Sequence, residues 1–197
     1  MSNSVVIRPF RIGDITFAAS IHFKTITGLS TLLGQSYLRE LYKTLVVNPR
    51  HVLLAAQADH HLIGFVTATE DIAETSSKLH NLLTLSSYGT LFKKIITFQI
   101  SPIMMFRRLK FENHQAKSYE KPYLSIVTFC VDRAYQRKGI GSQLIHRIEK
   151  EAKKRGAFYI YVDTRQSNSA ARSFYRKLGF LEETHVSGNV IFRKGVR

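Results

Sequence analysis

The sequence has little of what marks exported or membrane-spanning proteins. Its single cysteine, Cys130, excludes an internal disulfide framework and suits a reducing compartment. Residues 1–10 (MSNSVVIRPF) lack the apolar core of a signal peptide, so we expect a cytoplasmic protein. The apolar stretch at residues 95–106 is interrupted by Gln99 and Pro102 and is too short to cross a bilayer as a helix. We expect Cys130 to be a buried strand residue, not a nucleophile.

Acidic residues are also scarce. The 14 Asp and Glu residues face 29 Lys and Arg residues, which gives a formal net charge of +15. Such a chain attracts anions over about a Debye length and disfavours polycationic acceptors such as polyamines. The basic residues are dispersed, and neither a single-strand-binding pattern with interleaved aromatics nor a helix-turn-helix pattern is present, so nucleic acid is not the expected partner. A ligand that carries phosphate fits this charge better.

The most informative segment is residues 136–141 (QRKGIG). It follows an apolar, β-branched run at residues 124–131, typical of a buried strand, and a helical period begins at Ile140. A strand, a glycine loop and a helix N-terminus together form an anion site, because unsatisfied N–H groups and the positive end of the helix dipole converge there. Glycine is expected where a Cβ would block a phosphate oxygen. The loop alone also allows an ordinary turn between a strand and a helix.

Two common nucleotide-binding loops are excluded. The dinucleotide fingerprint requires a third glycine where Leu144 stands, and the Gly-Lys-Ser/Thr of the mononucleotide loop is absent. The helix after the loop is predicted to bury one apolar stripe and to end at Gly156. The stripe comprises Ile140, Leu144, Ile145, Ile148 and Ala152.

A second segment, residues 168–180 (NSAARSFYRKLGF), follows another apolar run at residues 158–162. Its pattern predicts an asparagine-capped helix that stops at Gly179. Together the two segments resemble the GNAT superfamily of acetyl-CoA-dependent N-acetyltransferases. The resemblance covers residues 123–192 closely and residues 5–69 loosely. Motif A of the family corresponds to Val131, Gln136, Gly139 and Gly141, and motif B to Asn168, Ala171, Phe174, Tyr175, Gly179 and Phe180.

The resemblance implies an α/β (α+β) fold: a central mixed, mostly antiparallel sheet of six to seven strands flanked by helices, in a single domain spanning residues 1–197. Helices are expected at residues 12–27 and 33–47, and a final hairpin is expected to turn at Gly188-Asn189. His60 and His61 lie on an earlier turn without further ligand spacing, so we predict no metal site. The strands are expected at residues 5–8, 51–57, 62–69, 124–131, 158–162, 181–187 and 190–194.

One stretch is foreign to this template. Residues 71–122, between the third and fourth strands, are too many for a structureless loop in a compact domain. We expect a helical insert there, and its apolar part at residues 95–106 has basic residues on both sides. Three roles remain open: a flap over the acceptor site, an amphipathic patch on an anionic membrane, and a contact in a homodimer.

The resemblance further implies direct transfer of an acetyl group from acetyl-CoA to a primary amine of an acceptor, either a small molecule such as an amino sugar or a protein. Backbone groups near Cys130 and Val131 would pair with the pantetheine arm and polarise the thioester carbonyl. Asn168 would contact the cofactor, and the Gln136 side chain would assist the loop. The pyrophosphate would be held by the backbone amides of Arg137, Lys138, Gly139, Ile140, Gly141 and Ser142.

Two residues are the catalytic candidates. Tyr175 would act as general acid toward the departing thiolate, and its alternative is a tyrosine that only packs in the core. Glu70, just past the third strand, would act as general base, and its alternative is a solvated loop carboxylate. Residues 124–131 contain no acid, so the base that several relatives carry on this strand is absent. A rival function also remains: a non-catalytic module of the same fold that binds an anionic polymer or a membrane surface.

Overall fold

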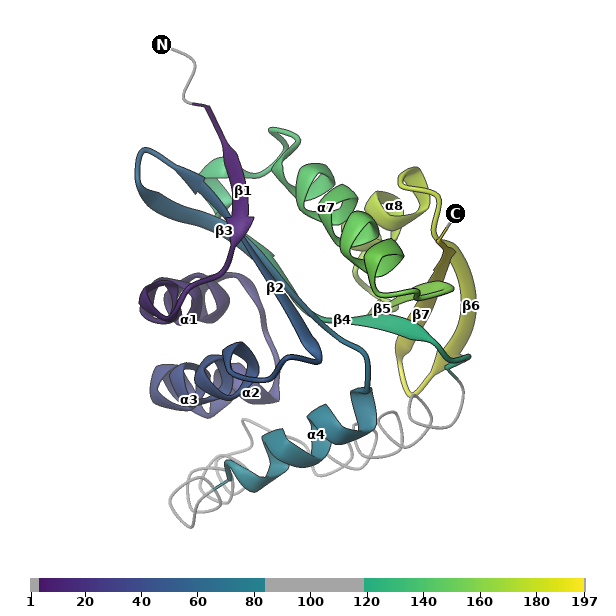
Figure 1. The fold of residues 1–197 in the computed structure, drawn as a ribbon, viewed down its shortest axis with the longest axis horizontal. Helices are drawn as coiled ribbons and strands as arrows, with labels where there is room; N and C mark the ends of the chain where they lie inside the picture. Colours follow the sequence, from purple (N-terminus) through teal and green to yellow (C-terminus); the bar gives the residue numbers. More distant parts are fainter. Residues whose placement is uncertain (1–3, 84–118, 197) are drawn as a thin grey trace.

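The computed structural model describes residues 4–83 and 119–196 of the chain. Seven strands lie in this part: β1 (Val6–Pro9), β2 (His51–Ala58), β3 (His61–Thr69), β4 (Tyr123–Val131), β5 (Tyr159–Arg165), β6 (Leu181–Val186) and β7 (Asn189–Gly195). They form one sheet in the order β1-β2-β3-β4-β5-β7-β6 (Figure 1). All neighbours are antiparallel except β4 and β5, which are parallel. The mixed, mostly antiparallel sheet is therefore confirmed.

Helices cover both faces of the sheet. On one face lie α1 (Ile15–Thr25), α2 (Leu29–Leu32) and α3 (Gly34–Val46), and on the other lie α7 (Ile140–Lys154) and α8 (Ser169–Lys177) (Figure 1). Short 3-10 turns, Ile12–Asp14 and Arg133–Tyr135, precede α1 and follow β4. The helix expected at residues 12–27 thus begins with a tighter turn. None of the helices among the described residues is long and apolar enough to span a membrane.

The insert expected between the third and fourth strands begins with a helix. This helix, α4 (Ile72–Asn81), starts directly after β3, and the Asp71 side chain accepts a hydrogen bond from the Glu74 backbone N–H at 3.0 Å. That bond is an N-terminal cap, which satisfies one of the free N–H groups of the first turn. The apolar stretch at residues 95–106 lies outside the described residues, so its role as flap, membrane patch or dimer contact stays a prediction.

The α7 face has an apolar core, and the predicted stripe of α7 is confirmed. All five stripe residues are at most 1% exposed, and they pack against the inward side chains of the sheet. The loop after α7 takes a left-handed conformation at Gly156, with φ +70°, one residue beyond the cap of the helix. A 3.6-residue period and a glycine stop were both local signals, which is why the sequence predicted them.

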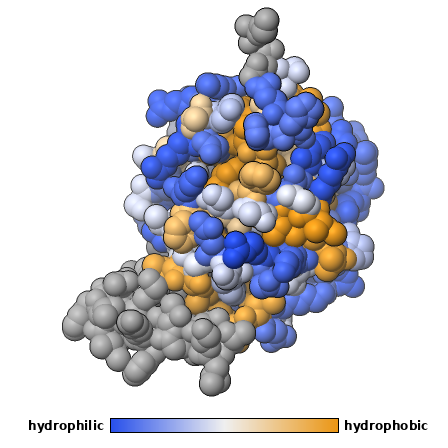
Figure 2. Space-filling model, turned by 90° about the vertical axis from the view of Figure 1, so that its left-hand side faces the viewer, coloured by the Kyte–Doolittle hydropathy of each residue, from blue (hydrophilic) through white to orange (hydrophobic). Residues whose placement is uncertain are grey.

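The opposite face combines aromatic and polar side chains. Tyr42 of α3 and Phe65 of β3 are fully buried and meet edge to face, with ring centroids 5.2 Å apart. From outside, this side of the molecule is mainly hydrophilic, with scattered apolar areas (Figure 2). Exposed aromatic side chains of α1, Phe17 and Phe23, belong to the surface. His22 of α1 is a polar side chain buried on this side, with its Nδ1 2.6 Å from the Tyr42 hydroxyl.

The structure corrects the predicted position of the turn in the final hairpin. We expected Gly188-Asn189 as the pair with positive φ, but the positive values fall on Ser187 (54°) and Gly188 (83°), and Asn189 already pairs with Val186 as the first residue of β7. Two consecutive left-handed residues suit the twist of a two-residue hairpin. The register is therefore one residue earlier than the sequence suggested, because glycine tolerates either position of such a turn.

Candidate active site

The segment between β4 and α7 forms an exposed, cationic loop. After β4, the Asp132 side chain accepts from the Ala134 N–H at 3.0 Å and starts a tight turn. Arg137 and Gly139 both take left-handed backbone conformations, with φ +60° and +79°, and α7 begins at the next residue, Ile140. The first N–H groups of a helix have no intrahelical partner, so they are free to bind an anion. The loop thus leads directly into the N-terminus of α7, and anion binding there stays a prediction.

The two motif glycines serve different needs. A Cβ on Gly139 would have no atom within 4 Å, so glycine is required there for its left-handed backbone. A Cβ on Gly141 would lie 3.1 Å from Cζ of Phe129 and 3.2 Å from Cζ of Phe174. These two rings are stacked, with centroids 5.6 Å apart. We had expected glycine to give a phosphate oxygen room; at Gly141 the structure shows that it gives room to two aromatic rings.

The parallel strands β4 and β5 separate beside this loop. Their pairing runs from Tyr123↔Tyr159 to Ile126↔Val162 and ends there. Beyond this point β4 continues along β3, and β5 continues along β7, so a wedge opens between them. Ala68 faces Ile126 while Thr67 faces Thr128, so a β-bulge lies at Val127, at the mouth of the wedge.

Beyond Ile126, the backbone groups of β4 that face the wedge have no pairing strand on that side. The Asp132 N–H donates to the Ile63 carbonyl across β3 at 2.8 Å. Since alternate residues of an antiparallel strand point their N–H and C=O groups to opposite sides, Phe129 and Val131 direct theirs toward the wedge and Cys130 directs its own toward β3. Within the predicted pair, Val131 is thus the residue that faces the wedge. Val127 and Phe129 were missed, because a bulge leaves no signature in one sequence.

Two predicted cofactor residues already make hydrogen bonds that hold the site together. The Gln136 side-chain amide donates to the Val131 carbonyl at 2.9 Å and ties the loop to the end of β4. The Asn168 side chain accepts from the Ala171 N–H at 3.1 Å, and so it caps α8 as the sequence indicated. Their contacts with a cofactor stay predictions. Both side chains lie at the ends of the two strands that separate.

Tyr175 projects from α8 into the core. Its side chain is 4% exposed, and its ring packs near Phe129, Phe174, Phe180 and Phe192. Burial, and then the negative charge of Asp163, raise the pKa of the Tyr175 hydroxyl well above its usual range. The hydroxyl therefore keeps its proton, as a general acid must. Asp163 and Cys130 belong to the two strands that border the wedge.

The thiol of Cys130 is buried on the α1 face. Its side chain belongs to the apolar cluster beneath α1 and α3 and is 3% exposed. Burial raises the pKa of Cys130 to about 12, so it stays a neutral thiol at pH 7. The expectation of a buried strand residue is confirmed.

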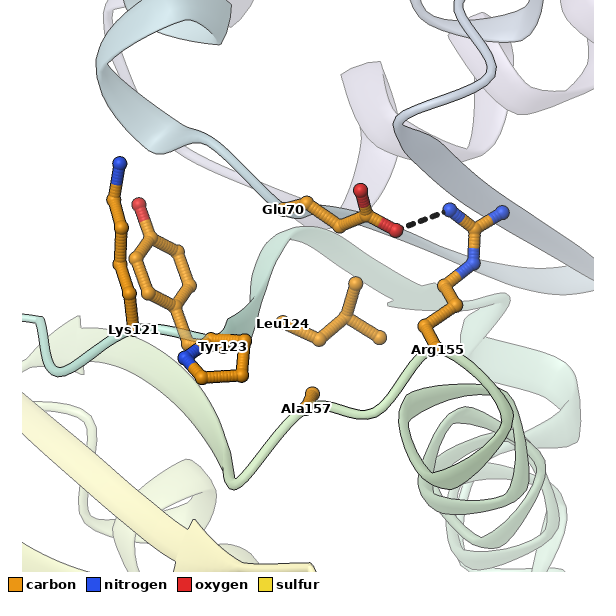
Figure 3. A pocket seen from close by; sticks show the side chains of 7 residues that line it. Glu70, Lys121, Tyr123, Leu124, Arg155 and Ala157 are labelled. Atoms are coloured by element: carbon orange, nitrogen blue, oxygen red, sulfur yellow. Dashed lines mark hydrogen bonds and ion pairs between the residues drawn. The ribbon is translucent and has the colours of Figure 1, made fainter.

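Glu70 lies at the other end of β4. Thr69, the last residue of β3, pairs with Ser125 near the start of β4, whereas the wedge opens toward Val131. Glu70 lines a hollow of about 180 Å³, and its carboxylate lies 2.5 Å from the guanidinium of Arg155. Figure 3 shows the two side chains pointing at each other. The ion pair joins β3 to the end of α7, which is the end opposite the glycine loop. This position gives Glu70 no reach to the wedge.

Asp163 is the carboxylate that the sequence reasoning missed. It is the first residue of β5 after pairing with β4 ends, and it pairs with Ile191 of β7 on its other side. Nearby, the Arg165 guanidinium donates to the Thr27 carbonyl at 2.8 Å, which fixes the segment between α1 and α2 beside the wedge. A signal did exist, because Asp163 directly follows the apolar run at residues 158–162.

Relatives of known name match about a third of this chain. A segment of 60 residues, 30% of this chain, is 38% identical to [Ribosomal protein bS18]-alanine N-acetyltransferase of Escherichia coli K12. A segment of 66 residues is 38% identical to GCN5-related N-acetyltransferase 7, chloroplastic, of Arabidopsis thaliana. The matches span 40% and 23% of these relatives.

Solved structures agree on the fold over almost the whole chain. The PaiA N-acetyltransferase of Thermoplasma acidophilum in complex with coenzyme A aligns over 98% of this chain and 99% of its own, with a TM-score of 0.62 and 20% identity. Aminoglycoside 6'-acetyltransferase type Ii aligns over 98% and 97%, with a TM-score of 0.61 and 15% identity. The family model of the Acetyltransferase (GNAT) family matches residues 26–180. The chain therefore belongs to the GNAT acetyltransferase family.

Proposed function

We propose that this protein is an N-acetyltransferase that moves an acetyl group from acetyl-CoA directly to a primary amine. The observation that carries the proposal is the wedge between β4 and β5 beside the N-terminus of α7. A diphosphate suits the free N–H groups of the loop. An extended arm suits the space where the two strands no longer pair, since backbone groups there need partners. The diphosphate and the pantetheine arm of the coenzyme would thus lie in one continuous site.

Different residues of this site have different roles in the acetyl transfer. Acetyl-CoA supplies an activated acetyl thioester when it is bound. The loop N–H groups hold the diphosphate, and the β4 backbone at Val127, Phe129 and Val131 supports the pantetheine arm and the polarised carbonyl. Holding both reactants together lowers the activation free energy of the transfer, since effective molarities in intramolecular reactions reach roughly 10⁵ to 10⁸ M.

Two polar side chains act at the wedge. Tyr175 gives its proton to the departing thiolate, and its raised pKa keeps that proton in place until the C–S bond breaks. Asp163 takes the position that we had expected of Glu70, as the carboxylate nearest the acceptor. Its negative charge attracts the acceptor ammonium and stabilises the protonated form of Tyr175.

The acceptor is proposed by class. Relatives and fold neighbours include a protein-alanine acetyltransferase and an aminoglycoside acetyltransferase, so protein N-termini and amino sugars are the first candidates. The net charge of +15 favours acceptors that carry phosphate or other anionic groups. Free-thiol release should be measured across a peptide with N-terminal alanine, glucosamine 6-phosphate, an aminoglycoside and free amino acids.

A thermal-shift titration with acetyl-CoA tests cofactor binding. At about 100 times Kd the ligand should add roughly 2.7 kcal/mol to stability. Gly139→Val should lose this shift, because a β-branched residue is strained at φ +79°. Gly13→Val, at an open position without positive φ, is the matched control. Salt-dependent DNA or vesicle binding without any coenzyme shift would instead support the non-catalytic module.

We also propose that the chain is one domain, residues 1–197, with an insert at residues 71–122. The helix α4 begins this insert directly after β3, below the strands in Figure 1, and the roles of flap, membrane patch and dimer contact stay open. A single cooperative melting transition is expected for one domain. Flotation with anionic vesicles and light scattering test the membrane and dimer alternatives. A cytoplasmic location, supported by the lone buried Cys130, is tested by cell fractionation.

A further inference from the structure

Two charged side chains of β5 beyond its pairing with β4 point to the α1 face of the sheet. Val162 packs in the core beneath α7, whereas Tyr161 belongs to a cluster of mainly tyrosine side chains on the opposite face. Because successive side chains of a strand alternate between faces, Asp163 and Arg165 share the face of Tyr161. Both residues follow Val162, the last residue of β5 that pairs with β4, so they belong to the β5 side of the wedge.

The Arg165 side chain reaches from β5 to the segment that follows α1. One of its terminal nitrogens donates to the Thr27 carbonyl at 2.8 Å, and Thr27 lies two residues beyond the end of α1. Buried residues of α1 pack in the same cluster as Cys130 of β4, so α1 covers the β4 side of the wedge. The Gln166 N–H donates to the Gly188 carbonyl at 2.9 Å, which fixes the end of β5 to the β6–β7 turn. The guanidinium is therefore held at the rim of the wedge on the α1 face.

This face of β5 runs from the interior to the surface. Tyr161 is 2% exposed, and its hydroxyl accepts from the Glu120 N–H at 3.2 Å, so the inner end is closed. Asp163 is half-buried, and Arg165, the last residue of β5, is exposed. The charge of Asp163 raises the pKa of Tyr175, so the carboxylate lies near the proposed proton donor. A ligand that enters from this face meets the guanidinium first and the carboxylate second.

The positive charge of Arg165 makes no ion pair within the described ranges, unlike the arginines around it. The other arginines of residues 155–193 all pair with acids: Arg155 with Glu70, Arg172 and Arg176 with Glu182, and Arg193 with Glu120 and Glu183. The bond to the Thr27 carbonyl uses one of the five N–H donors of the Arg165 guanidinium. An exposed guanidinium with further donors suits bidentate binding of a carboxylate or a phosphate.

Asp163 and Arg165 present opposite charges at a fixed spacing. Residues two apart on one strand have Cα atoms about 6.5 Å apart, at roughly 3.3 Å per residue. The proposed function places the acceptor ammonium at the Asp163 carboxylate. An anionic group a few bonds from that nitrogen would then reach the guanidinium. A second ammonium in the same place would be repelled, since like charges at close range are unfavourable.

We propose that Arg165 determines the acceptor specificity, and that the acceptor is a small amine with a carboxylate or phosphate a few bonds from its nitrogen. The proposal rests on the N-acetyltransferase function above and names the class of its acceptor. Free amino acids and amino-sugar phosphates combine these two charges. Aminoglycosides and protein N-termini without a nearby acid do not. Arg165 binds the acceptor equally in the ground state and the transition state, so it acts mainly on KM.

Matched pairs of acceptors test this proposal with the full-length protein. Glucosamine 6-phosphate and glucosamine differ by a phosphate, and alanine and alaninamide differ by a carboxylate, so the two pairs distinguish the two anions. Free-thiol release gives kcat/KM for each compound. We expect the wild type to prefer the anionic member of at least one pair by about 10- to 100-fold, the range of a charged hydrogen bond. Arg165→Gln should remove most of this preference through a higher KM for the anionic member.

Two further variants separate anion binding from a structural role. Arg165→Lys keeps the charge but not the planar fork of donors, so it should retain part of the preference. Arg39→Gln removes the same charge from α3, where Arg39 also lacks an ion pair within the described residues, and it should change the preference by less than about twofold. The ratio within a pair is compared between variants, so the different basicity of the two amines cancels. A side chain that only holds the Thr27 segment would affect both members of a pair alike.

Several results would overturn the proposal and leave the proposed function standing. They are equal kcat/KM within both pairs in the wild type, an equal loss within each pair in Arg165→Gln, and faster acetylation of an amidated peptide with N-terminal alanine and no acidic side chain. If Arg165→Gln does not fold, Arg165→Lys decides, and a preference as strong as that of the wild type would contradict bidentate binding. If the wild type shows a coenzyme shift but acetylates neither pair nor any other compound tested, the proposed function fails, and the assignment of Arg165 fails with it.

Discussion

The two faces of the sheet bury different kinds of side chain. The core beneath α7 and α8 is built from aliphatic and aromatic side chains, and Tyr175 brings the one hydroxyl among its described buried members. The core beneath α1, α3 and α4 combines apolar side chains with hydrogen-bonded polar ones. Buried polar residues on this side include His22, His51, Thr67, Thr69, Thr75, Ser125 and Thr128.

Adjacent residues of β3 show how the sequence separates the two. Val66 and Ala68 point to the α7 side, while Thr67 and Thr69 point to the opposite side. Successive side chains of a strand alternate between faces, so an alternating apolar and polar sequence makes one dry face and one polar face even when both are buried. The apolar face gives the glycine loop a rigid support. The polar face holds hydrogen-bonded side chains such as His22 and Tyr42.

The largest effect is expected where the apolar face carries its hydroxyl. Tyr175→Phe should lower kcat by about 10² to 10⁴ at saturating substrates, because the departing thiolate loses its proton donor. Stability should change little, since the ring keeps its aromatic neighbours. Tyr159→Phe, a half-buried tyrosine of β5, is the control. Turnover equal to that of the wild type in Tyr175→Phe would assign this tyrosine to packing alone.

The polar face should make stability depend on pH. The folded pKa of His22 is about 4, below the ordinary value of 6.5, because burial disfavours the charged ring. Between these two values the unfolded chain binds a proton that the folded chain does not, so the free energy of unfolding falls as the pH drops from 6.5 toward 4. The loss should reach about 3 kcal/mol, at 1.36 kcal/mol per pKa unit.

Urea unfolding at pH 7 and pH 4.5 measures this loss. His22→Asn keeps an acceptor for the Tyr42 hydroxyl and removes the titrating ring, so it should flatten most of the pH dependence. The pKa of His51 is also lowered, by burial first, and His51→Asn therefore serves as a comparison with the same sign. If His22→Asn left the slope unchanged, the charged groups of the surface would have to be its source.

The packing of the apolar face is tested at Gly141. In Gly141→Val the added atoms would press on Phe129 and Phe174, so we expect a loss of about 1 to 3 kcal/mol in the free energy of unfolding. The acetyl-CoA shift should fall as well, because the first turn of α7 must move. Gly28→Val, where nothing lies within 4 Å of an added Cβ, should change neither quantity by much. Loss of binding at full stability would instead assign Gly141 to phosphate contact.

Local signals allowed much of this fold to be predicted from the sequence. The glycine stop at Gly156, the stripe of α7 and the Asn168 cap are each set by neighbours within a few residues, and all three were found as expected. Both motifs lie on such segments, which is why they identified the family. The helices and strands around them followed from the same kind of reasoning.

The features that depend on long-range pairing could not be predicted from the sequence. The bulge at Val127 depends on how β4 aligns with β3, and the position of Glu70 depends on the antiparallel direction of these strands. The partner of Glu70, Arg155, is 85 residues away in the chain. The hydrogen bonds of Tyr42 likewise join residues from separate elements. Neither register nor such pairings can be read from one sequence, so the sequence did not show that Glu70 lies at the end of β4 opposite the opening of the wedge.

The smallest effect is expected from two separate substitutions at neighbouring positions of β3. Val66→Thr puts a hydroxyl without a partner into the dry face and should cost about 1 to 3 kcal/mol of stability. Thr67→Val removes a buried hydroxyl that already lacks a partner among the described residues, so it should be neutral or stabilise by up to about 1 kcal/mol. The two changes exchange a methyl and a hydroxyl group in opposite directions at the same depth in the same strand. Urea unfolding at pH 7 compares them. If Thr67→Val were as costly as Val66→Thr, then Thr67 would have a bound water or another partner, and the polar face would be fully satisfied at the mouth of the wedge.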